Sequence, residues 1–208
     1  MQARAKRERD SAKHQGQGAA IKKMKLRITK TPLPDLVVVE IDYFKDARGF
    51  FIESWHRRDF AEAGLSFDFV QDSHSSSTYK VLRGLHYQDM RAPMAKLVRC
   101  TVGRILDVAV DLRVKSPAFG KAFTVELSAE NKKQLFVPVG FAHGFATLSE
   151  YCEVQYKQTE FYRRETEGGI AWNDSDVGID WPFRDPILSE RDKNQQTLKQ
   201  YLQNPAFE

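Results

Sequence analysis

The amino-acid sequence predicts an all-β protein, folded as a sandwich or barrel of short strands with a short helix near the C-terminus. The apolar residues mostly recur with a period of two, which is the period of a strand with one buried face. Turn-forming Gly and Pro residues separate these segments at short intervals. Only residues 190–202, after the candidate N-cap Ser189, have a helical pattern. Many short strands at this spacing are typical of sandwiches and barrels, including the double-sheet jelly roll.

The strand pattern recurs along the chain at residues 37–41, 50–55, 82–88, 95–101, 104–113, 123–127, 134–137, 142–148 and 152–159. In residues 104–113, four apolar side chains alternate with four others: Leu106, Val108, Val110 and Leu112 against Asp107, Ala109, Asp111 and Arg113. This alternation predicts a half-buried strand.

The composition indicates one folded domain behind a polar tail. Of 208 residues, 41% are hydrophobic and 12% aromatic, which suffices for one large core. No internal repeat or linker divides residues 25–208, so we expect a single jelly-roll domain there. Residues 1–24 are rich in Lys and Arg and lack apolar periodicity. They are predicted to be a disordered basic tail, and an electrostatic anchor is the alternative.

The positive charge is concentrated at the N-terminus. The first 30 residues carry ten basic and two acidic side chains, a surplus of eight, whereas the whole chain has a net charge of +4. The remainder is therefore net negative, which disfavours binding to nucleic acid. No apolar run approaches the roughly 20 residues that span a bilayer, and the N-terminus lacks the apolar stretch of a signal peptide. We expect a cytoplasmic protein that does not bind membranes.

Four side chains capable of acid–base chemistry fall in apolar surroundings. Tyr156 and Lys96 each share a strand face with apolar residues, and His86 and His143 lie within strand-like apolar segments. An inward-facing Lys is costly unless it is paired or faces a ligand cavity. Taken singly, the Tyr and His residues are also compatible with a structural role, and Lys96 could extend its ammonium to the mouth of a barrel. The four together indicate a site inside one barrel.

Six motifs in a fixed order resemble the dTDP-4-dehydrorhamnose 3,5-epimerase family. They are Arg48-Gly-Phe-Phe-Ile-Glu53, Gln71-Asp-Ser-His-Ser75, Leu82-Arg-Gly-Leu-His-Tyr-Gln88, Lys96-Leu-Val-Arg99, Gly140-Phe-Ala-His-Gly-Phe145 and Gly169-Ile-Ala-Trp-Asn-Asp174. The resemblance runs from about Leu33 to Tyr201. It implies a cupin-type jelly-roll barrel that usually forms a homodimer and needs no metal or other cofactor. The implied substrate is dTDP-4-dehydro-6-deoxy-D-glucose, epimerised at C3 and C5 to dTDP-4-dehydro-L-rhamnose, the precursor of L-rhamnose.

The resemblance also implies three proton-transfer roles that fit the chemistry of this reaction. Both carbons lie next to the C4 ketone, so removal of either proton gives an enolate. The resemblance makes His86 the base, and a His ordinarily titrates near neutral pH. It makes Tyr156 the acid on the opposite face, and a phenol is neutral at rest. Lys96 is the implied partner of the enolate oxygen, where a cation stabilises the developing charge.

A carboxylate near the C-terminus is implied as the partner of the base. Asp192 matches the position of the family's aspartate, which would fix the tautomer of His86 and raise its basicity. Ser189 and Asp192 also match a helix capping box, and both interpretations remain open. Substrate contacts implied by the resemblance are Arg48, Glu53, Gln71, Arg83, Lys96, His143, Glu167 and Arg191. The arginines suit a diphosphate, which guanidinium groups bind in a bidentate way.

Two departures from the family pattern and one geometric conflict stand out. Ser73 replaces a common Asn, and Arg191 replaces a common Lys, which affects the substrate preference more than the reaction class. Arg83 and His86 would fall on opposite faces of an ideal strand. Both could face one cavity if Gly84 forms a bulge.

Three other functions are alternatives to a 3,5-epimerase. A metal-dependent cupin oxygenase needs converging His ligands, but Gln88 stands where a second His would be expected. Cys100 and Cys152 are too few and too isolated for a disulfide framework or a thiolate metal site. A non-enzymatic sugar-binding barrel would not need a base, an acid and an enolate partner together. An epimerase of one carbon, from an antibiotic deoxysugar pathway, could share the same base and acid.

Overall fold

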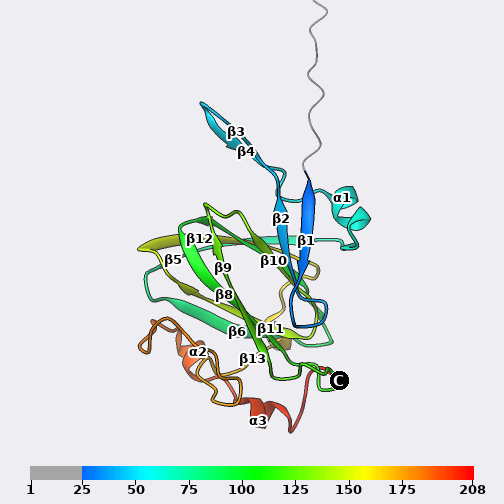
Figure 1. The fold of residues 1–208 in the computed structure, drawn as a ribbon. Coiled ribbons are helices and arrows are strands. Elements are labelled where there is room, and N and C mark those ends of the chain that lie inside the picture. The colour runs from blue at the N-terminus through cyan, green and yellow to red at the C-terminus, as the bar shows by residue number, and fades with distance from the viewer. Residues whose placement is uncertain (1–24) are drawn as a thin grey trace, which may run out of the picture.

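The computed structural model describes residues 25–208 as two facing antiparallel sheets with one separate hairpin (Figure 1). The predicted tail, residues 1–24, lies outside the described residues. The six-stranded sheet contains, in spatial order, β1 (Leu26–Lys30), β2 (Val37–Ile41), β10 (Gln134–Val137), β7 (Lys96–Val102), β12 (Tyr151–Gln158) and β5 (Gln71–Thr78). The five-stranded sheet contains β13 (Glu167–Gly169), β6 (Leu82–Gln88), β11 (Phe141–Thr147), β8 (Arg104–Asp111) and β9 (Ala122–Ser128). The predicted all-β, double-sheet jelly roll is confirmed.

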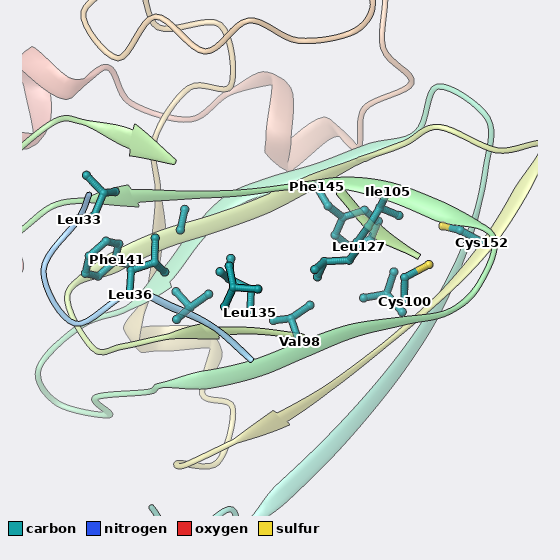
Figure 2. Close-up of a cluster of buried hydrophobic side chains, with 14 of the residues drawn as sticks. Leu33, Leu36, Val98, Cys100, Ile105, Leu127, Leu135, Phe141, Phe145 and Cys152 are labelled. Carbon is teal, nitrogen blue, oxygen red and sulfur yellow. The ribbon is translucent and has the colours of Figure 1, made fainter. Parts of the chain in front are cut away.

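The central hydrophobic core fills the space between the two sheets (Figure 2). Val98 and Leu135 come from the six-stranded sheet, and Ile105, Leu127 and Phe145 from the five-stranded sheet. All five side chains are less than 5% exposed. Burial of this apolar area, at about 25 cal/mol per Å², holds the two sheets face to face. The two cysteines belong to the same core and are free thiols.

Strand β8 is buried on both faces, so the expectation of a half-buried strand is wrong. Its apolar face, with Val108 and Val110, packs against Tyr201 and other residues of the C-terminal segment. The opposite face, with Asp107 and Ala109, is also fully buried, and Ala109 belongs to the core between the sheets. A C-terminal segment that folds back over the sheet is not visible in the alternation of a single strand.

The C-terminal segment forms two short helices instead of the expected helix over residues 190–202. Helix α2 spans Glu190–Lys193 and helix α3 spans Leu198–Tyr201, each with its own N-cap. Between them Gln196 forms an isolated β-bridge to Ile170, and residues 194–197 are not helical. Figure 1 shows both helices beneath the five-stranded sheet. The tertiary contact therefore overrides the helical pattern of the sequence.

A two-stranded arm projects from the body. It consists of β3 (Phe44–Asp46) and β4 (Gly49–Phe51), so the strand expected at residues 50–55 is shorter than predicted and pairs only within this hairpin. Figure 1 shows the arm extending away from both sheets. Phe50 and Phe51 are 59% and 61% exposed. Helix α1 (Arg57–Glu62) follows the arm and packs Phe60 against the outer face of the six-stranded sheet.

Candidate active site

A cavity of about 930 Å³ is lined by both sheets and by helix α2. Nine of the site residues expected from the sequence line it: Gln71, Arg83, His86, Lys96, His143, Tyr156, Glu167, Arg191 and Asp192. They come from seven different elements, so their convergence depends on the tertiary fold.

His86 on β6 pairs with Asp192 on α2. The His86 Nε2 atom lies 2.5 Å from Asp192 Oδ1, and the two side chains are 16% and 4% exposed. Burial lowers the pKa of His86 below its usual 6.5, and its hydrogen bond to Asp192 only partly opposes this. Burial alone would raise the pKa of Asp192, but the bonds from His86 and Ser189 hold it below its usual value. A neutral imidazole beside an ionised carboxylate carries its proton on Nε2, which leaves Nδ1 free to accept a proton.

Ser189 explains how Asp192 is placed. Its hydroxyl oxygen accepts a hydrogen bond from the Asp192 backbone N–H at 3.2 Å, and its O–H donates to Asp192 Oδ2 at 2.8 Å. Ser189 therefore caps α2 while orienting the carboxylate whose other oxygen contacts His86. Helix capping and pairing with the imidazole, the two sequence interpretations of this motif, occur together.

A bulge in β6 brings Arg83 and His86 to the same cavity. His86 is opposite His143 and Arg83 is opposite Phe145, so β6 has one residue more than β11 between these pairs. Gly84 lies in this bulge with φ +121°, a conformation that favours glycine. A Cβ atom at Gly84 would come within 2.5 Å of the backbone of Gly144 on the neighbouring strand β11. The expectation of a bulge at Gly84 is confirmed.

Tyr156 and Lys96 lie on the facing sheet. The strands β12 and β7 are neighbours, and Tyr156 is opposite Val98 while Gln158 is opposite Lys96. Tyr156 packs partly against the central core and lines the cavity. Burial lowers the pKa of Lys96 to about 8, although Glu167 and Asp107 act in the opposite direction. A phenol and an ammonium thus line the cavity opposite the His86 imidazole.

His143 has a buried carboxylate partner that the sequence analysis did not single out. Its Nε2 atom lies 2.9 Å from Asp107 Oδ1, and the two side chains are 8% and 0% exposed. Asp107 Oδ2 is buried without a hydrogen-bond partner among residues 25–208. Such a burial is costly, which points to a role in the site. The alternation pattern misled here, because it grouped Asp107 with the polar face of a half-buried strand.

One end of the cavity carries a cluster of amide and hydroxyl groups. The Ser73 hydroxyl donates to Gln158 Oε1 at 2.6 Å, and Gln71 Nε2 donates to both of these side chains. The backbone N–H of Tyr162 donates to Gln71 Oε1 at 3.0 Å. Gln158 and Tyr162 were not singled out from the sequence. Gln158 shares a strand face with Tyr156, and that spacing is the signal that could have found it.

Arg191 and Glu167 lie beside the imidazole. Arg191 Nη1 forms an ion pair with Glu167 Oε2, and the same oxygen accepts a hydrogen bond from the Tyr162 hydroxyl at 2.9 Å. Arg191 Nη2 lies 2.9 Å from His86 Nε2 and 3.2 Å from His86 Nδ1.

Arg48 and Glu53 do not reach the cavity of their own chain. Arg48 lies at the tip of the arm with a side chain that is 90% exposed, and it pairs with Asp46 at 2.6 Å. Glu53 follows the arm and is exposed. The structure therefore does not bring these two residues together with the other nine.

Chemically, the cavity combines a carboxylate-paired imidazole on one sheet with a phenol and an ammonium on the other. This arrangement can remove a proton from one face of a bound molecule and return one to the other. Within residues 25–208 no group of three or more His, Cys, Asp or Glu side chains is placed to hold a metal ion. No helix in the same range is long and apolar enough to cross a membrane.

The double-sheet barrel with this cavity places the protein among the cupin-type sugar epimerases. The family model of dTDP-4-dehydrorhamnose 3,5-epimerase matches residues 30–200, and the chain belongs to this family of isomerases. It is 51% identical over 172 residues to the dTDP-4-dehydrorhamnose 3,5-epimerase of Shigella flexneri, covering 82% of this chain and 95% of that protein.

Solved structures agree with this assignment. The dTDP-4-dehydrorhamnose 3,5-epimerase of Elizabethkingia anophelis superposes with a TM-score of 0.80 at 49% identity, covering 84% of this chain and 97% of that one. The Legionella pneumophila dTDP-6-deoxy-D-glucose-3,5-epimerase, solved with dTDP-4-keto-L-rhamnose, has a TM-score of 0.81 at 41% identity, covering 84% and 94% of the two chains. More distant relatives include a dTDP-4-dehydrorhamnose 3-epimerase of Streptomyces niveus, which is 36% identical over 150 residues, 72% of each chain.

Proposed function

We propose that the protein inverts both C3 and C5 of dTDP-4-dehydro-6-deoxy-D-glucose to give dTDP-4-dehydro-L-rhamnose. The observation that carries the proposal is the pairing of His86 with Asp192 on one wall of the cavity, facing Tyr156 and Lys96 on the other. Epimerisation next to a ketone needs a base and an acid on opposite faces of the sugar ring, together with a charge near the ketone oxygen.

In this mechanism each inversion is a balanced pair of proton transfers. His86 Nδ1 takes the proton from the carbon next to the ketone, and the electron pair of the broken C–H bond moves into the enolate with O4 as its oxyanion. Lys96 stabilises that oxyanion through its positive charge. The Tyr156 O–H then protonates the carbon from the opposite face, and the ketone re-forms. Solvent afterwards removes the proton from His86 and restores the one on Tyr156.

The remaining cavity residues suit a nucleoside diphosphate. Arg83 and Arg164 line the cavity and can hold phosphate oxygens. The amide cluster of Gln71 and Gln158, beside the Tyr162 ring, can hydrogen-bond and stack with a planar base. Ser73 is part of that cluster and bonds to both amides, so it influences the preference for the nucleotide through Gln71 and Gln158.

We further propose a homodimer in which the arm of one copy completes the cavity of the other. Phe50 and Phe51 on the arm are more than half exposed, and exposed apolar groups of this kind mark interaction surfaces. Arg48 lies at the tip of the arm and Glu53 shortly after it, and both lie outside the cavity of their own chain. A two-fold contact would bring both residues to a second copy, where they could bind the substrate.

The second candidate is an epimerase of a single carbon. The relative from Streptomyces niveus, named a 3-epimerase, favours it because the family includes such enzymes. A base and an acid of the same kind would serve one carbon or two.

An isotope experiment separates the two candidates. The purified protein is incubated with dTDP-4-dehydro-6-deoxy-D-glucose in D2O, and the deuterium at C3 and at C5 of the product is counted by NMR. We expect deuterium at both carbons with both configurations inverted. Inversion and labelling at one carbon only would support the single-carbon epimerase, and no labelling at either carbon would contradict both candidates.

A further inference from the structure

We propose that Gln88 is a positioning residue whose carboxamide ties the segment of residues 160–166 to the strand that carries His86. This role rests on the proposed binding of the nucleotide by Tyr162 and Arg164, which both belong to the segment. Gln88 then sets the distance between the bound nucleotide and the base, and with it the affinity for a sugar linked to a nucleoside diphosphate.

Both ends of the Gln88 carboxamide are bound to the segment. Its Oε1 atom accepts a hydrogen bond from the backbone N–H of Arg163 at 3.0 Å, and its Nε2 atom donates to the backbone carbonyl of Arg163 at 3.0 Å. The Thr166 hydroxyl donates to the same Oε1 atom at 2.9 Å. Gln88 and Thr166 are 5% and 4% exposed. A carboxamide that bonds to both backbone groups of one residue holds that residue much as a neighbouring strand would.

Arg163 is the residue between the two side chains that serve the site. Tyr162 and Arg164 line the cavity, whereas the Arg163 side chain does not. The backbone at Arg163 is extended, with φ −131° and ψ 119°, so its side chain and those of its two neighbours point in opposite directions. A displacement of the Arg163 backbone would therefore move both Tyr162 and Arg164 relative to the cavity.

The same strand carries the base and its distance to the segment. His86 and Gln88 lie two positions apart on β6, and both line the cavity. On the adjacent strand β13, Gly169 is opposite His86 and Glu167 is opposite Gln88. The segment thus enters the sheet directly beside the base, and the Gln88 bonds fix it there.

Polar contacts rather than burial hold the segment. Residues 161–165 are all exposed, so little apolar area is available to keep them in place. The backbone N–H of Tyr162 bonds to Gln71 near one end, and the backbone carbonyl of Thr166 accepts from the Asp89 N–H at the other, at 2.8 Å. Gln88 holds the middle. Without it, a substrate would have to order the segment on binding, and this ordering costs affinity.

The loss should appear in binding and not in the chemical step, because the base is held separately by Asp192 on α2. Gln88→Met keeps the approximate size of the side chain and removes its donor and its acceptor. We expect the KM for dTDP-4-dehydro-6-deoxy-D-glucose and the Kd for dTDP to rise about tenfold, and kcat to change by less than about threefold. The Kd is measured by calorimetry.

The matched control removes a carboxamide that holds a turn elsewhere. Asn131 accepts from the backbone N–H of Ser128 and donates to the backbone carbonyl of Glu126, and it does not line the cavity. Asn131→Leu should therefore leave KM, kcat and the Kd for dTDP unchanged.

A second variant and a double variant show whether the effect passes through the segment. Thr166→Val removes one of the bonds to Gln88, so KM and Kd should rise less than in Gln88→Met. The two changes together should have no more effect than Gln88→Met alone, because Thr166 acts through the Gln88 oxygen. In the ligand-free protein, exchange of the Arg163 amide hydrogen, followed by NMR, should be faster in Gln88→Met and unchanged in Asn131→Leu.

Three results overturn the proposal: unchanged KM and Kd in Gln88→Met, additive effects in the double variant, or unchanged exchange at the Arg163 amide. If Gln88→Met does not fold, an unchanged Kd for dTDP in Thr166→Val overturns it as well. The exchange and calorimetry need no turnover, so they still judge Gln88 if the protein binds dTDP but epimerises no sugar. A working epimerase with the wild-type KM in Gln88→Met would reject the role of Gln88 and leave the proposed function standing.

Discussion

The His86 Nε2 atom lies 2.5 Å from Asp192 Oδ1, although 106 positions separate the two residues in the chain. The contact joins a strand of the five-stranded sheet to a four-residue helix near the C-terminus. In the proposed mechanism this contact fixes the ring tautomer and leaves Nδ1 to accept the proton of the substrate. The cap of this helix, Ser189, bonds to the same carboxylate.

Replacing Asp192 by Asn tests this contact. The variant keeps the shape of the side chain but removes its negative charge. That charge raises the pKa of His86. We expect proton exchange to slow by about 10²-fold or more. The acidic limb of the pH–rate profile should move to lower pH, because the imidazole loses the charge that favours its protonated form. Thr197→Ala, which removes the cap of the neighbouring helix α3, is the control and should leave the profile unchanged. An unshifted acidic limb in Asp192→Asn would contradict the pairing.

The pH dependence of the wild type follows from the two shifted groups. His86 must be neutral to accept a proton, so activity should rise as the pH passes its pKa, which lies below 6.5. Lys96 must be charged to stabilise the enolate, so activity should fall as the pH passes about 8. A bell-shaped profile of kcat/KM is therefore expected. Activity that keeps rising well above pH 8 would show that the Lys96 charge is not required.

The buried Asp107 should affect that alkaline limb. Its charge raises the pKa of Lys96, so Asp107→Asn should move the alkaline limb to lower pH. It also replaces the charged acceptor of His143 by a neutral amide oxygen, so we expect a loss of about 1–3 kcal/mol in the free energy of unfolding. Asp185→Asn, which changes an exposed carboxylate paired with Lys80, is the control for the loss of a charge. Thermal unfolding and a pH–rate profile measure the two effects. If the alkaline limb stays in place, Asp107 has no influence on Lys96.

If the arm completes the cavity of a second copy, two inactive variants should restore activity when they are combined. One chain carries Arg48→Ala with Glu53→Ala, and the other carries His86→Ala. If the arm acts in the cavity of the partner, a mixed dimer has one intact site, and an equal mixture should regain about a quarter of the wild-type activity in a two-fold dimer. The activity is assayed after the chains are unfolded and refolded together. Mixing that restores no activity would show that the arm does not serve a second copy.

Chelation provides a further test of the mechanism. In the proposed mechanism, His86, Tyr156 and Lys96, which all line the cavity, supply a base, an acid and a positive charge without a metal ion. Turnover should therefore be unchanged after dialysis against EDTA. A loss that one particular divalent metal restores would contradict this mechanism.

Much of the fold could be predicted from the sequence because short runs of apolar residues are separated by turn-forming residues. The strands β2, β6 and β10 begin and end at the expected residues. The strand β5 was missed because its sequence, Gln71–Thr78, is polar, and it lies at the edge of the six-stranded sheet, where few apolar contacts are needed. The prediction of one C-terminal helix over residues 190–202 was wrong because a backbone bridge at Gln196 separates two short helices.

Site residues could be predicted where the face of a single strand decides their position. They could not be predicted where segments far apart in the sequence meet. Tyr156 and Lys96 share faces with core residues, and this pattern is local. Asp107 was missed because its strand is covered on its other face by the C-terminal segment, which turns its polar side inward. The position of Arg191 on His86 depends on Glu167 in a third element, and no local pattern contains that information.

The division of labour between His86 and Tyr156 is the central claim, and hydrogen exchange in D2O tests it most directly. His86→Ala should abolish both epimerisation and the wash-out of the C3 and C5 hydrogens, because no enolate forms. Tyr156→Phe keeps the ring but loses the acid, so it should form no inverted product while His86 still exchanges substrate hydrogen on the original face. Either loss should amount to about 10²–10⁴-fold. Melting temperatures near that of the wild type would show that both variants are folded. Normal wash-out by His86→Ala, or full epimerisation by Tyr156→Phe, would contradict the assignment.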